Sequence, residues 1–192
     1  MRRTCPERPA TRGADPNDRN LLTEPGDHGI GRSRGGLTSK IHYLVDGRGL
    51  PLVVLVGAGQ AHDNPMLPAL LAHLRVARDG PGRPRTTPDR LRADKAYSAS
   101  STRELLAARG VKATIPQPSD QIAHRKRRGS AGGRPPMFDP VDYKHRHVVE
   151  GSFAIVKQWR GLATRYELAI VYRAGALLNA IYQWLKALRN TP

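Results

Sequence analysis

The chain has 192 residues, enough for one domain with a sizeable hydrophobic core, and 39% of them are hydrophobic. Its 32 lysines and arginines outnumber 16 aspartates and glutamates, and the resulting net charge of +16 favours a polyanionic partner such as nucleic acid. A single cysteine, Cys5, excludes an internal disulfide framework. The sequence shows neither a secretory signal nor an apolar run long enough to cross a membrane. These features predict a cytoplasmic protein.

Residues 1–36 are rich in arginine, proline, glycine and aspartate. Leu21, Leu22 and Ile30 are nearly their only large aliphatic side chains, so burial cannot offset the entropy lost on ordering. We therefore predict a flexible basic arm without a strand, followed by a folded domain over residues 37–190.

An antiparallel hairpin is predicted over residues 38–46 and 50–57. Ile41, Tyr43 and Val45 recur at every second position, which is the period of a strand with one apolar face. The run "LPLVVLV" is typical of a buried strand, and "DGRG" between the two has the composition of a turn.

Helices and strands alternate in the next part of the chain. The segment "HDNPMLPALLAHLRVAR" predicts a helix with Pro65 in its first turn and an apolar stripe, and "RLRADKAYS" contains the end of a short strand. A helix follows in "SASSTRELLAARG", ended by Gly110, and then a strand in "VKATIP". This order predicts an α/β fold, with a mixed sheet that has the antiparallel hairpin at one end and helices at its flanks.

The carboxyl-terminal part is predicted to be helical after a polar, basic loop, "SDQIAHRKRRGSAGGRPP". One helix opens at Asp139 and Pro140 and runs to about Trp159. A second, amphipathic helix is expected over residues 171–189. Its apolar positions include Leu177, Leu178, Ile181, Trp184, Leu185 and Leu188.

Glu150 is the first candidate functional residue. Helical periodicity places it on one stripe with Tyr143, Arg146 and Lys157, whereas the opposite face is expected to pack on the sheet. That opposite face carries Val148, Ser152, Ile155 and Trp159. The stripe is compatible with an ordinary Arg146–Glu150 helix pair and with an acid that works beside a DNA backbone.

Asp94 is the second candidate, because it follows a short strand at the edge where open α/β sheets place their sites. A simpler reading is that it caps the next helix. Together, Asp94 and Glu150 would supply oxygen ligands suited to Mg²⁺, the ion that phosphodiester chemistry often uses in pairs. The histidines lack the cysteine context of a structural zinc site, so no zinc site is predicted.

The spacing Tyr143-x2-Arg146-x3-Glu150-x6-Lys157 resembles the signature around the catalytic glutamate of bacterial insertion-sequence transposases of the DDE type, in the IS4/IS5-like group. Further segments resemble that family's blocks in the same order: "GRSRGGLTSKIH", "GQAHDNP", "ADKAYSAS", "GRPPMFD" and "KQWRGLATRYE". The resemblance spans residues 24–188 and implies a ribonuclease-H-like fold, dependence on Mg²⁺ and cut-and-paste transfer of DNA.

The resemblance also implies roles for individual residues. Asp94 and Glu150 would be the second and third acids of the catalytic triad and the metal ligands. Contacts to DNA phosphates, or positioning of the glutamate, are expected of Tyr143, Arg146 and Lys157, while Trp159 and Arg160 would be structural or lie at the DNA edge. Backbone contacts are also expected of the basic loop residues Arg125, Lys126, Arg127 and Arg128.

One departure from the family concerns its first catalytic aspartate, which lies on a strand upstream of "GRSRGG". No such strand is predicted within residues 1–36: their aspartates lie among prolines and glycines, and Asp46 fits the hairpin turn. We therefore expect the chain to be the carboxyl-terminal part of a transposase that lacks the amino-terminal strand and is inactive alone. The missing strand would leave a sheet edge that favours pairing with another chain. A smaller departure is Gly151, where the family usually has arginine.

The leading hypothesis is an incomplete transposase catalytic domain that acts on double-stranded DNA, at insertion-sequence ends and target, in the bacterial nucleoid. Its expected partners are an upstream transposase polypeptide or further copies of itself. Two alternatives remain: a non-catalytic DNA-binding remnant that represses transposition, and a ribosome-associated basic protein, against which the family blocks argue.

Overall fold

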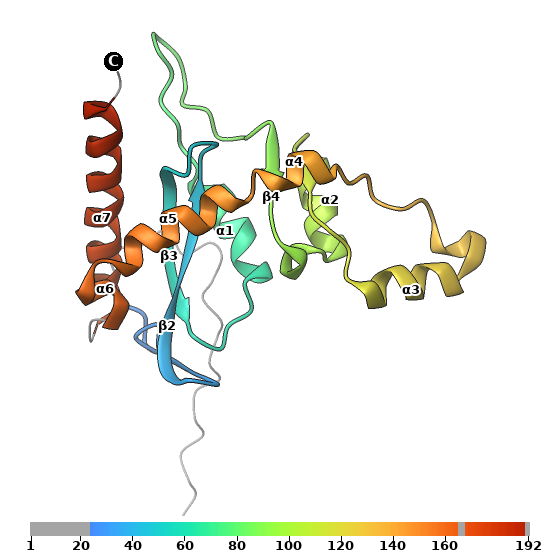
Figure 1. The fold of residues 1–192 in the computed structure, drawn as a ribbon, viewed down its shortest axis with the longest axis horizontal. Coiled ribbons are helices and arrows are strands. Elements are labelled where there is room, and N and C mark those ends of the chain that lie inside the picture. Colours follow the sequence, from blue (N-terminus) through green and yellow to red (C-terminus); the bar gives the residue numbers. More distant parts are fainter. Residues whose placement is uncertain (1–23, 165–167, 191–192) are drawn as a thin grey trace, which may run out of the picture.

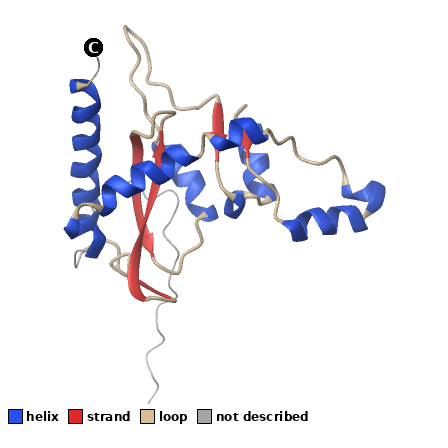
Figure 2. Cartoon of the chain, viewed as in Figure 1, coloured by secondary structure: helices blue, strands red, loops and turns tan. Residues whose placement is uncertain are grey.

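The computed structural model describes residues 24–164 and 168–190 and has an α/β architecture (Figures 1 and 2). Its strands form two sheets. The first is antiparallel, with β1 (Gly31–Ser33), β2 (Gly36–Val45) and β3 (Pro51–Ala58), and the second is parallel, with β4 (Arg90–Arg92) and β5 (Lys112–Thr114). The helices, with η for a 3₁₀ helix, are η1 (Asn64–Met66), α1 (Leu67–His73), η2 (Lys95–Tyr97), α2 (Ser100–Ala108), α3 (Ser119–Arg127), η3 (Gly129–Gly132), α4 (Pro140–Lys144), α5 (His147–Lys157), α6 (Arg160–Thr164) and α7 (Ala169–Arg189).

The predicted hairpin is confirmed as β2 and β3, paired in a register that sets Tyr43 opposite Val54. The turn between them is organised by Asp46, whose carboxylate accepts hydrogen bonds from the backbone amides of Arg48 and Leu50, both at 2.8 Å. Gly49 closes the turn at φ +87°, a left-handed conformation that favours glycine.

Both faces of this hairpin are covered, which explains the uninterrupted apolar run of β3. On one face Val54 packs with Val156 of α5 and with Tyr172 of α7. On the other face Val53 and Leu55 pack with residues of α1. Because successive strand residues point to opposite faces, two covering layers require apolar side chains at every position.

Helix α7 lies along β3 (Figure 1), and its buried face differs from the one predicted. Four of the apolar positions expected from the sequence are exposed: Leu178, Ile181, Leu185 and Leu188. The buried residues are small or polar, namely Ala169, Tyr172, Ala176, Asn179, Ala180 and Gln183. Alanines let the helix approach the strand closely, and a 2.7 Å hydrogen bond between the Gln183 and Asn179 side chains satisfies two of the buried polar groups.

The second sheet confirms the predicted parallel pairing, with α2 as the crossover between β4 and β5. Leu91 of β4, Leu106 of α2 and Ile115 form its core together with Leu67 and Leu71 of α1. Helix α1 therefore joins the two sheets. One mixed sheet was expected, but among the described residues no strand pairs with both β2 and β4, and the strands form two separate sheets.

The amino-terminal prediction is wrong in part. Residues 1–23 lie outside the described residues, but the segment from Glu24 onward is built into the fold and contains β1, which pairs with the start of β2. The Glu24 carboxylate accepts hydrogen bonds from the backbone amides of Ala169 and Ile170 at the start of α7, both at 2.9 Å. A side-chain cap thus orders a segment that has little apolar surface to bury.

Two further predictions need correction. The loop predicted over residues 119–136 contains α3 and η3, and α3 is a helix with no fully buried residue. Asp120 in its first turn and basic residues in its last turn complement the helix dipole, which supports a helix that hydrophobic periodicity does not reveal. The single helix predicted from Asp139 to Trp159 is divided at His145 and Arg146 into α4 and α5.

No helix among the described residues is both long and apolar enough to span a membrane.

Candidate active site

Asp94 lies directly after β4 and is half-buried. Its carboxylate accepts a 2.9 Å hydrogen bond from the backbone amide of Ala96 and so caps η2. This contact matches the simpler reading of Asp94 as a capping residue, yet it leaves other oxygen lone pairs available. An open hollow of about 670 Å³ adjoins the carboxylate, lined by Asp94, Lys95, Ala96, Gln117, Pro118, Ser119 and Asp120.

Glu150 lies in the first turn of α5, and its side chain is 57% exposed. The guanidinium of Arg146 donates a hydrogen bond to the glutamate Oε1 at 2.5 Å. The same guanidinium lies 5.6 Å from the centroid of the Tyr143 ring, a cation–π arrangement. Arg146 thus contacts both residues, although the break at His145 and Arg146 leaves Tyr143 on α4 and Glu150 on α5.

Arg146 is influenced electrostatically by both candidate acids, but it contacts only one of them among the described residues. Partial burial by itself would lower the pKa of its guanidinium, whereas the neighbouring Tyr143, Glu150 and Asp94 together raise that pKa above its usual value. Asp94 has the smallest of these effects, although 56 positions separate it from Glu150 in the sequence. Within residues 24–164 and 168–190, Arg146 forms an ion pair with Glu150 and none with Asp94.

The fit of this pair to a metal ion follows from its chemistry. Mg²⁺ in proteins is bound by one or two carboxylates, and water or substrate phosphates complete its octahedron. Asp94 and Glu150 have the ligand chemistry for such a pair. The described residues contain no group of three or more histidine, cysteine, aspartate or glutamate side chains that could hold a metal ion.

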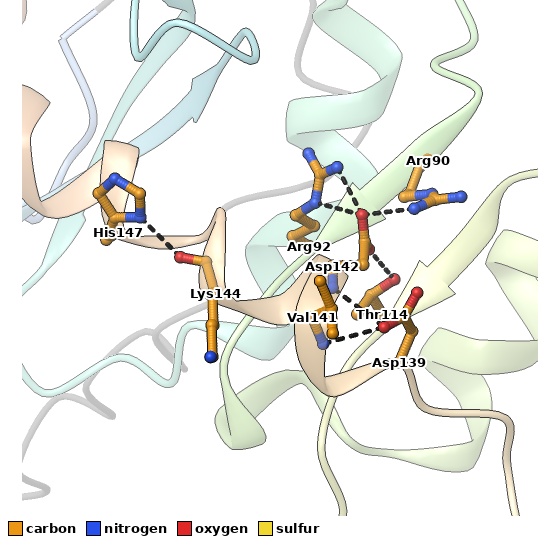
Figure 3. Close-up of polar contacts among 8 residues, drawn as sticks. All are labelled: Arg90, Arg92, Thr114, Asp139, Val141, Asp142, Lys144 and His147. Carbon is orange, nitrogen blue, oxygen red and sulfur yellow. Dashed lines mark hydrogen bonds and ion pairs between the residues drawn. The ribbon is translucent and has the colours of Figure 1, made fainter.

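A buried acid that the sequence did not single out lies beside the site. Asp142 of α4 is only 6% exposed and binds Arg90, Arg92 and Thr114 (Figure 3). Hydrogen bonds from Arg92, together with those from Thr114 and Arg90, outweigh desolvation and hold the pKa of the Asp142 carboxyl well below its usual value. Arg90, Arg92, Thr114 and Asp142 are called the Asp142 cluster below.

The basic residues expected to contact DNA lie in two places. Lys157 is exposed at the end of α5. Lys126, Arg127 and Arg128 are exposed at the end of α3, which projects away from the two sheets in Figure 1, whereas Arg125 is half-buried against the following turn. These positions give two cationic surfaces rather than one continuous stripe.

Comparison with known proteins decides the family. The transposase DDE domain family matches residues 18–182. The chain belongs to this family. It is also similar to a putative transposase for insertion sequence element IS6501 from Brucella ovis, with 32% identity over 151 residues, which cover 78% of this chain and the full length of that protein. No solved structure matches the chain significantly.

Within this transposase domain, the sequence identified Asp94 and Glu150 but missed Asp142. The segment "RLR" indicates that an acidic partner is needed nearby, because Arg90 and Arg92 lie on one face of a strand whose other face is buried. Two partly exposed cations on one strand face favour a nearby acidic partner. The sequence cannot say which of several downstream acids provides it.

Trp159 lies in a structural position, which is one of the two roles expected for it from the sequence. Its ring packs against the core beneath α7 and lies 6.0 Å from the ring of Tyr182. Arg160, the next residue, is exposed at the start of α6.

Proposed function

We propose that this chain is the catalytic part of a DNA transposase with a ribonuclease-H-like arrangement of its acids. In this proposal it hydrolyses a DNA strand at the end of an insertion sequence and passes the freed 3′ hydroxyl to target DNA. Membership of the DDE family supports the reaction class. The observations that support the proposed site are the contact of Arg146 with Glu150 and the position of Asp94 beside an open hollow just past the end of β4.

Asp94 and Glu150 are the proposed ligands of Mg²⁺. When bound, the ion would activate the attacking oxygen and stabilise the leaving oxygen of the scissile phosphate. In the structure Glu150 is neutralised by Arg146, so binding of the ion requires the glutamate to leave this ion pair. Arg146 then becomes free to contact a DNA phosphate, while Tyr143 remains beside its guanidinium.

A third carboxylate completes the site in this proposal. The described residues contain no group of three acidic, histidine or cysteine side chains arranged to hold a metal ion. We infer that the third carboxylate comes from another polypeptide, either an upstream transposase polypeptide or a second copy of the chain. The acid would reach the pair along the side of β2 that does not face β3, where residues 40–45 pair with no described strand.

The basic surfaces are the proposed DNA contacts. Lys157 and the exposed cations of α3 are suited to phosphate oxygens, which carry no sequence information but give affinity. Binding should therefore weaken steeply as salt is raised, since phosphate contacts release counterions. Salt-insensitive binding would contradict this assignment.

The reaction is tested with labelled insertion-sequence ends and Mg²⁺, using the chain alone and together with the upstream polypeptide. Glu150→Gln keeps the size of the side chain and removes its charge. Glu104→Gln, at an exposed acid of α2, is the matched control. We expect cleavage that depends on Glu150 and is unchanged by the control. Cleavage that survives Glu150→Gln would exclude the proposed metal site.

A second candidate function is supported by the same ion pair. With Glu150 held by Arg146, the described residues form a cationic surface that can bind DNA without cutting it. Such a chain would repress transposition by occupying insertion-sequence ends. DNA binding with no cleavage under any pairing of polypeptides would favour this function over the first.

A further inference from the structure

The side of β4 that carries two arginines faces α4. Residues two apart on a strand point to the same face, so Arg90 and Arg92 lie opposite Leu91, which is buried in the core of the second sheet. Asp94 follows Arg92 by two residues, just past the end of the strand. The face that holds these cations therefore leads directly to the candidate metal ligand.

Asp142 joins α4 to that face. Its Oδ1 accepts hydrogen bonds from Arg92 Nε at 3.0 Å, from Arg92 Nη2 at 2.6 Å and from Arg90, while its Oδ2 accepts one from Thr114 of β5 at 2.6 Å (Figure 3). Asp139 caps α4 by accepting hydrogen bonds from the amides of Val141 and Asp142. These contacts fix where α4 begins and how it packs against β4 and β5.

The carboxyl-terminal end of the α4–α5 segment is held by apolar packing rather than by hydrogen bonds. Phe153 of α5 packs on Tyr43 of β2 with ring centroids 5.0 Å apart, and Val156 is buried in the first core. Helix α5 crosses the first sheet, whereas α4 lies beside β4 (Figure 1). Glu150 lies between these two attachments, and the break at His145 and Arg146 separates it from the first of them.

We propose that Asp142 is a positioning residue of the candidate active site. It holds the amino-terminal end of the α4–α5 segment on the sheet that ends in Asp94, and so sets the separation between Asp94 and Glu150. The importance of that separation rests on the proposed metal site, but the positioning itself does not. Loss of the Asp142 contacts removes the attachment of α4 to β4 and β5, so that the α4–α5 segment is then held through α5, by its packing on the first sheet and by the approach of Val148 to Gly49.

The positioning is tested by the distance between two nitroxide labels on the full chain. The parent carries Cys5→Ser, Ala107→Cys on α2 and Ala154→Cys on α5, since both alanines are exposed and neither touches the candidate site. Pulsed electron paramagnetic resonance should give one narrow distance distribution in the parent. Asp142→Asn should broaden it or shift its maximum. A distribution as narrow as that of the parent, at the same distance, would overturn the proposal.

Two controls separate positioning from general loosening. Asp89→Asn removes an exposed aspartate that pairs with Arg85 outside the cluster, and it should leave the distribution unchanged. Leu71→Ala weakens the core without touching the Asp142 cluster. If Leu71→Ala broadens the distribution as much as Asp142→Asn does, the effect is not specific and the proposal fails. Should Asp142→Asn not fold, Arg92→Lys, which keeps the charge and loses the forked geometry, carries the same expectation.

Binding of Mn²⁺, a paramagnetic substitute for Mg²⁺, distinguishes this inference from the proposed function. If the parent binds Mn²⁺, Asp142→Asn should weaken the affinity by about 10- to 100-fold, the usual effect of residues that orient ligands. If the parent binds no Mn²⁺ while Asp142→Asn still broadens the distances, the metal site fails and the positioning role stands. Unchanged distances with unchanged Mn²⁺ affinity would refute the positioning role.

Discussion

The two sheets are stabilised by different kinds of interaction. The hairpin of β2 and β3 is covered on both faces by apolar side chains from α1, α5 and α7. The pair of β4 and β5 has strands of only three residues, with a core on one face and the charged Asp142 cluster on the other. Apolar burial stabilises strongly but is not directional. Charge-assisted hydrogen bonds stabilise and also fix the relative orientation of the groups that they join. The directional interactions lie where the candidate ligand Asp94 must be aimed.

This difference predicts that the apolar cores determine the free energy of unfolding, whereas the Asp142 cluster determines how α4 is oriented on β4 and β5. Leu71 is the point where the two meet, since it lies on α1 and packs in the core of the second sheet. Substitutions in each part should therefore have different consequences.

Leu71→Ala should lower the free energy of unfolding by about 2–5 kcal/mol, the usual cost of truncating a buried leucine. Leu71 is 1% exposed, so a cavity remains where its side chain was. Urea denaturation followed by circular dichroism measures the change. Leu178→Ala, at a position that is 60% exposed on α7, is the control and should change stability by less than about 0.5 kcal/mol. Equal losses in the two variants would contradict the assignment of the core.

Asp142→Asn should lower the free energy of unfolding by about 1–3 kcal/mol at pH 7, since hydrogen bonds to a charged acceptor are lost. The pKa of the Asp142 carboxyl is lower in the folded chain than in the unfolded chain, so its stabilisation is present above the unfolded value near 3.9. It is lost as pH falls from there toward the folded pKa. Denaturation from pH 7 down to pH 3 should show the difference between parent and variant shrinking below about pH 4. A difference that stays constant with pH would show that the charge of Asp142 is not what stabilises the cluster.

Glu150→Gln should change the free energy of unfolding by less than about 0.5 kcal/mol, because in the described part of the chain its side chain pairs only with Arg146, in an exposed helix pair. The same substitution should abolish Mg²⁺-dependent cleavage. Thermal unfolding and the cleavage assay on one preparation test both expectations. A large loss of stability in Glu150→Gln would indicate a structural acid and weaken the case for a metal ligand.

The sequence predicted the first sheet better than the second, for a physical reason. Alternation of apolar residues and the turn composition around Asp46 encode the hairpin locally, so its strands were predicted to within two residues. The pairing of β4 with β5 was also predicted. Whether β2 and β4 belong to one sheet depends on a strand between them, which no local pattern reports.

The errors have similar causes. Helix α7 was assigned the wrong buried face, because hydrophobicity marks Leu178 and Leu185 while close packing against β3 selects Ala176 and Ala180. Helix α3 was missed because charge and capping support it, and these leave no apolar periodicity. Segment 24–36 was predicted to be flexible, although Glu24 caps a helix 145 residues away in the sequence.

The candidate site was predictable only in part. The four-residue spacing of Arg146 and Glu150 was enough to predict their contact. Tyr143 contacts Arg146 across the break between α4 and α5, which helical spacing did not predict. The position of Asp94 relative to Arg146 depends on how α4 docks on β4, a tertiary contact made through Asp142. No spacing rule relates a strand end to a residue 48 positions later, so the cluster had to be seen in the structure.

The central claim, that Asp94 and Glu150 share one divalent cation, is tested most directly by iron-directed cleavage of the polypeptide. Fe²⁺ replaces Mg²⁺, and hydroxyl radicals formed with ascorbate and peroxide cut the backbone next to the bound ion. The account predicts cuts near both residue 94 and residue 150, with both lost in Asp94→Asn alone and both suppressed by excess Mg²⁺. Cutting near one residue that persists when the other is substituted would show that the two acids do not hold a common ion.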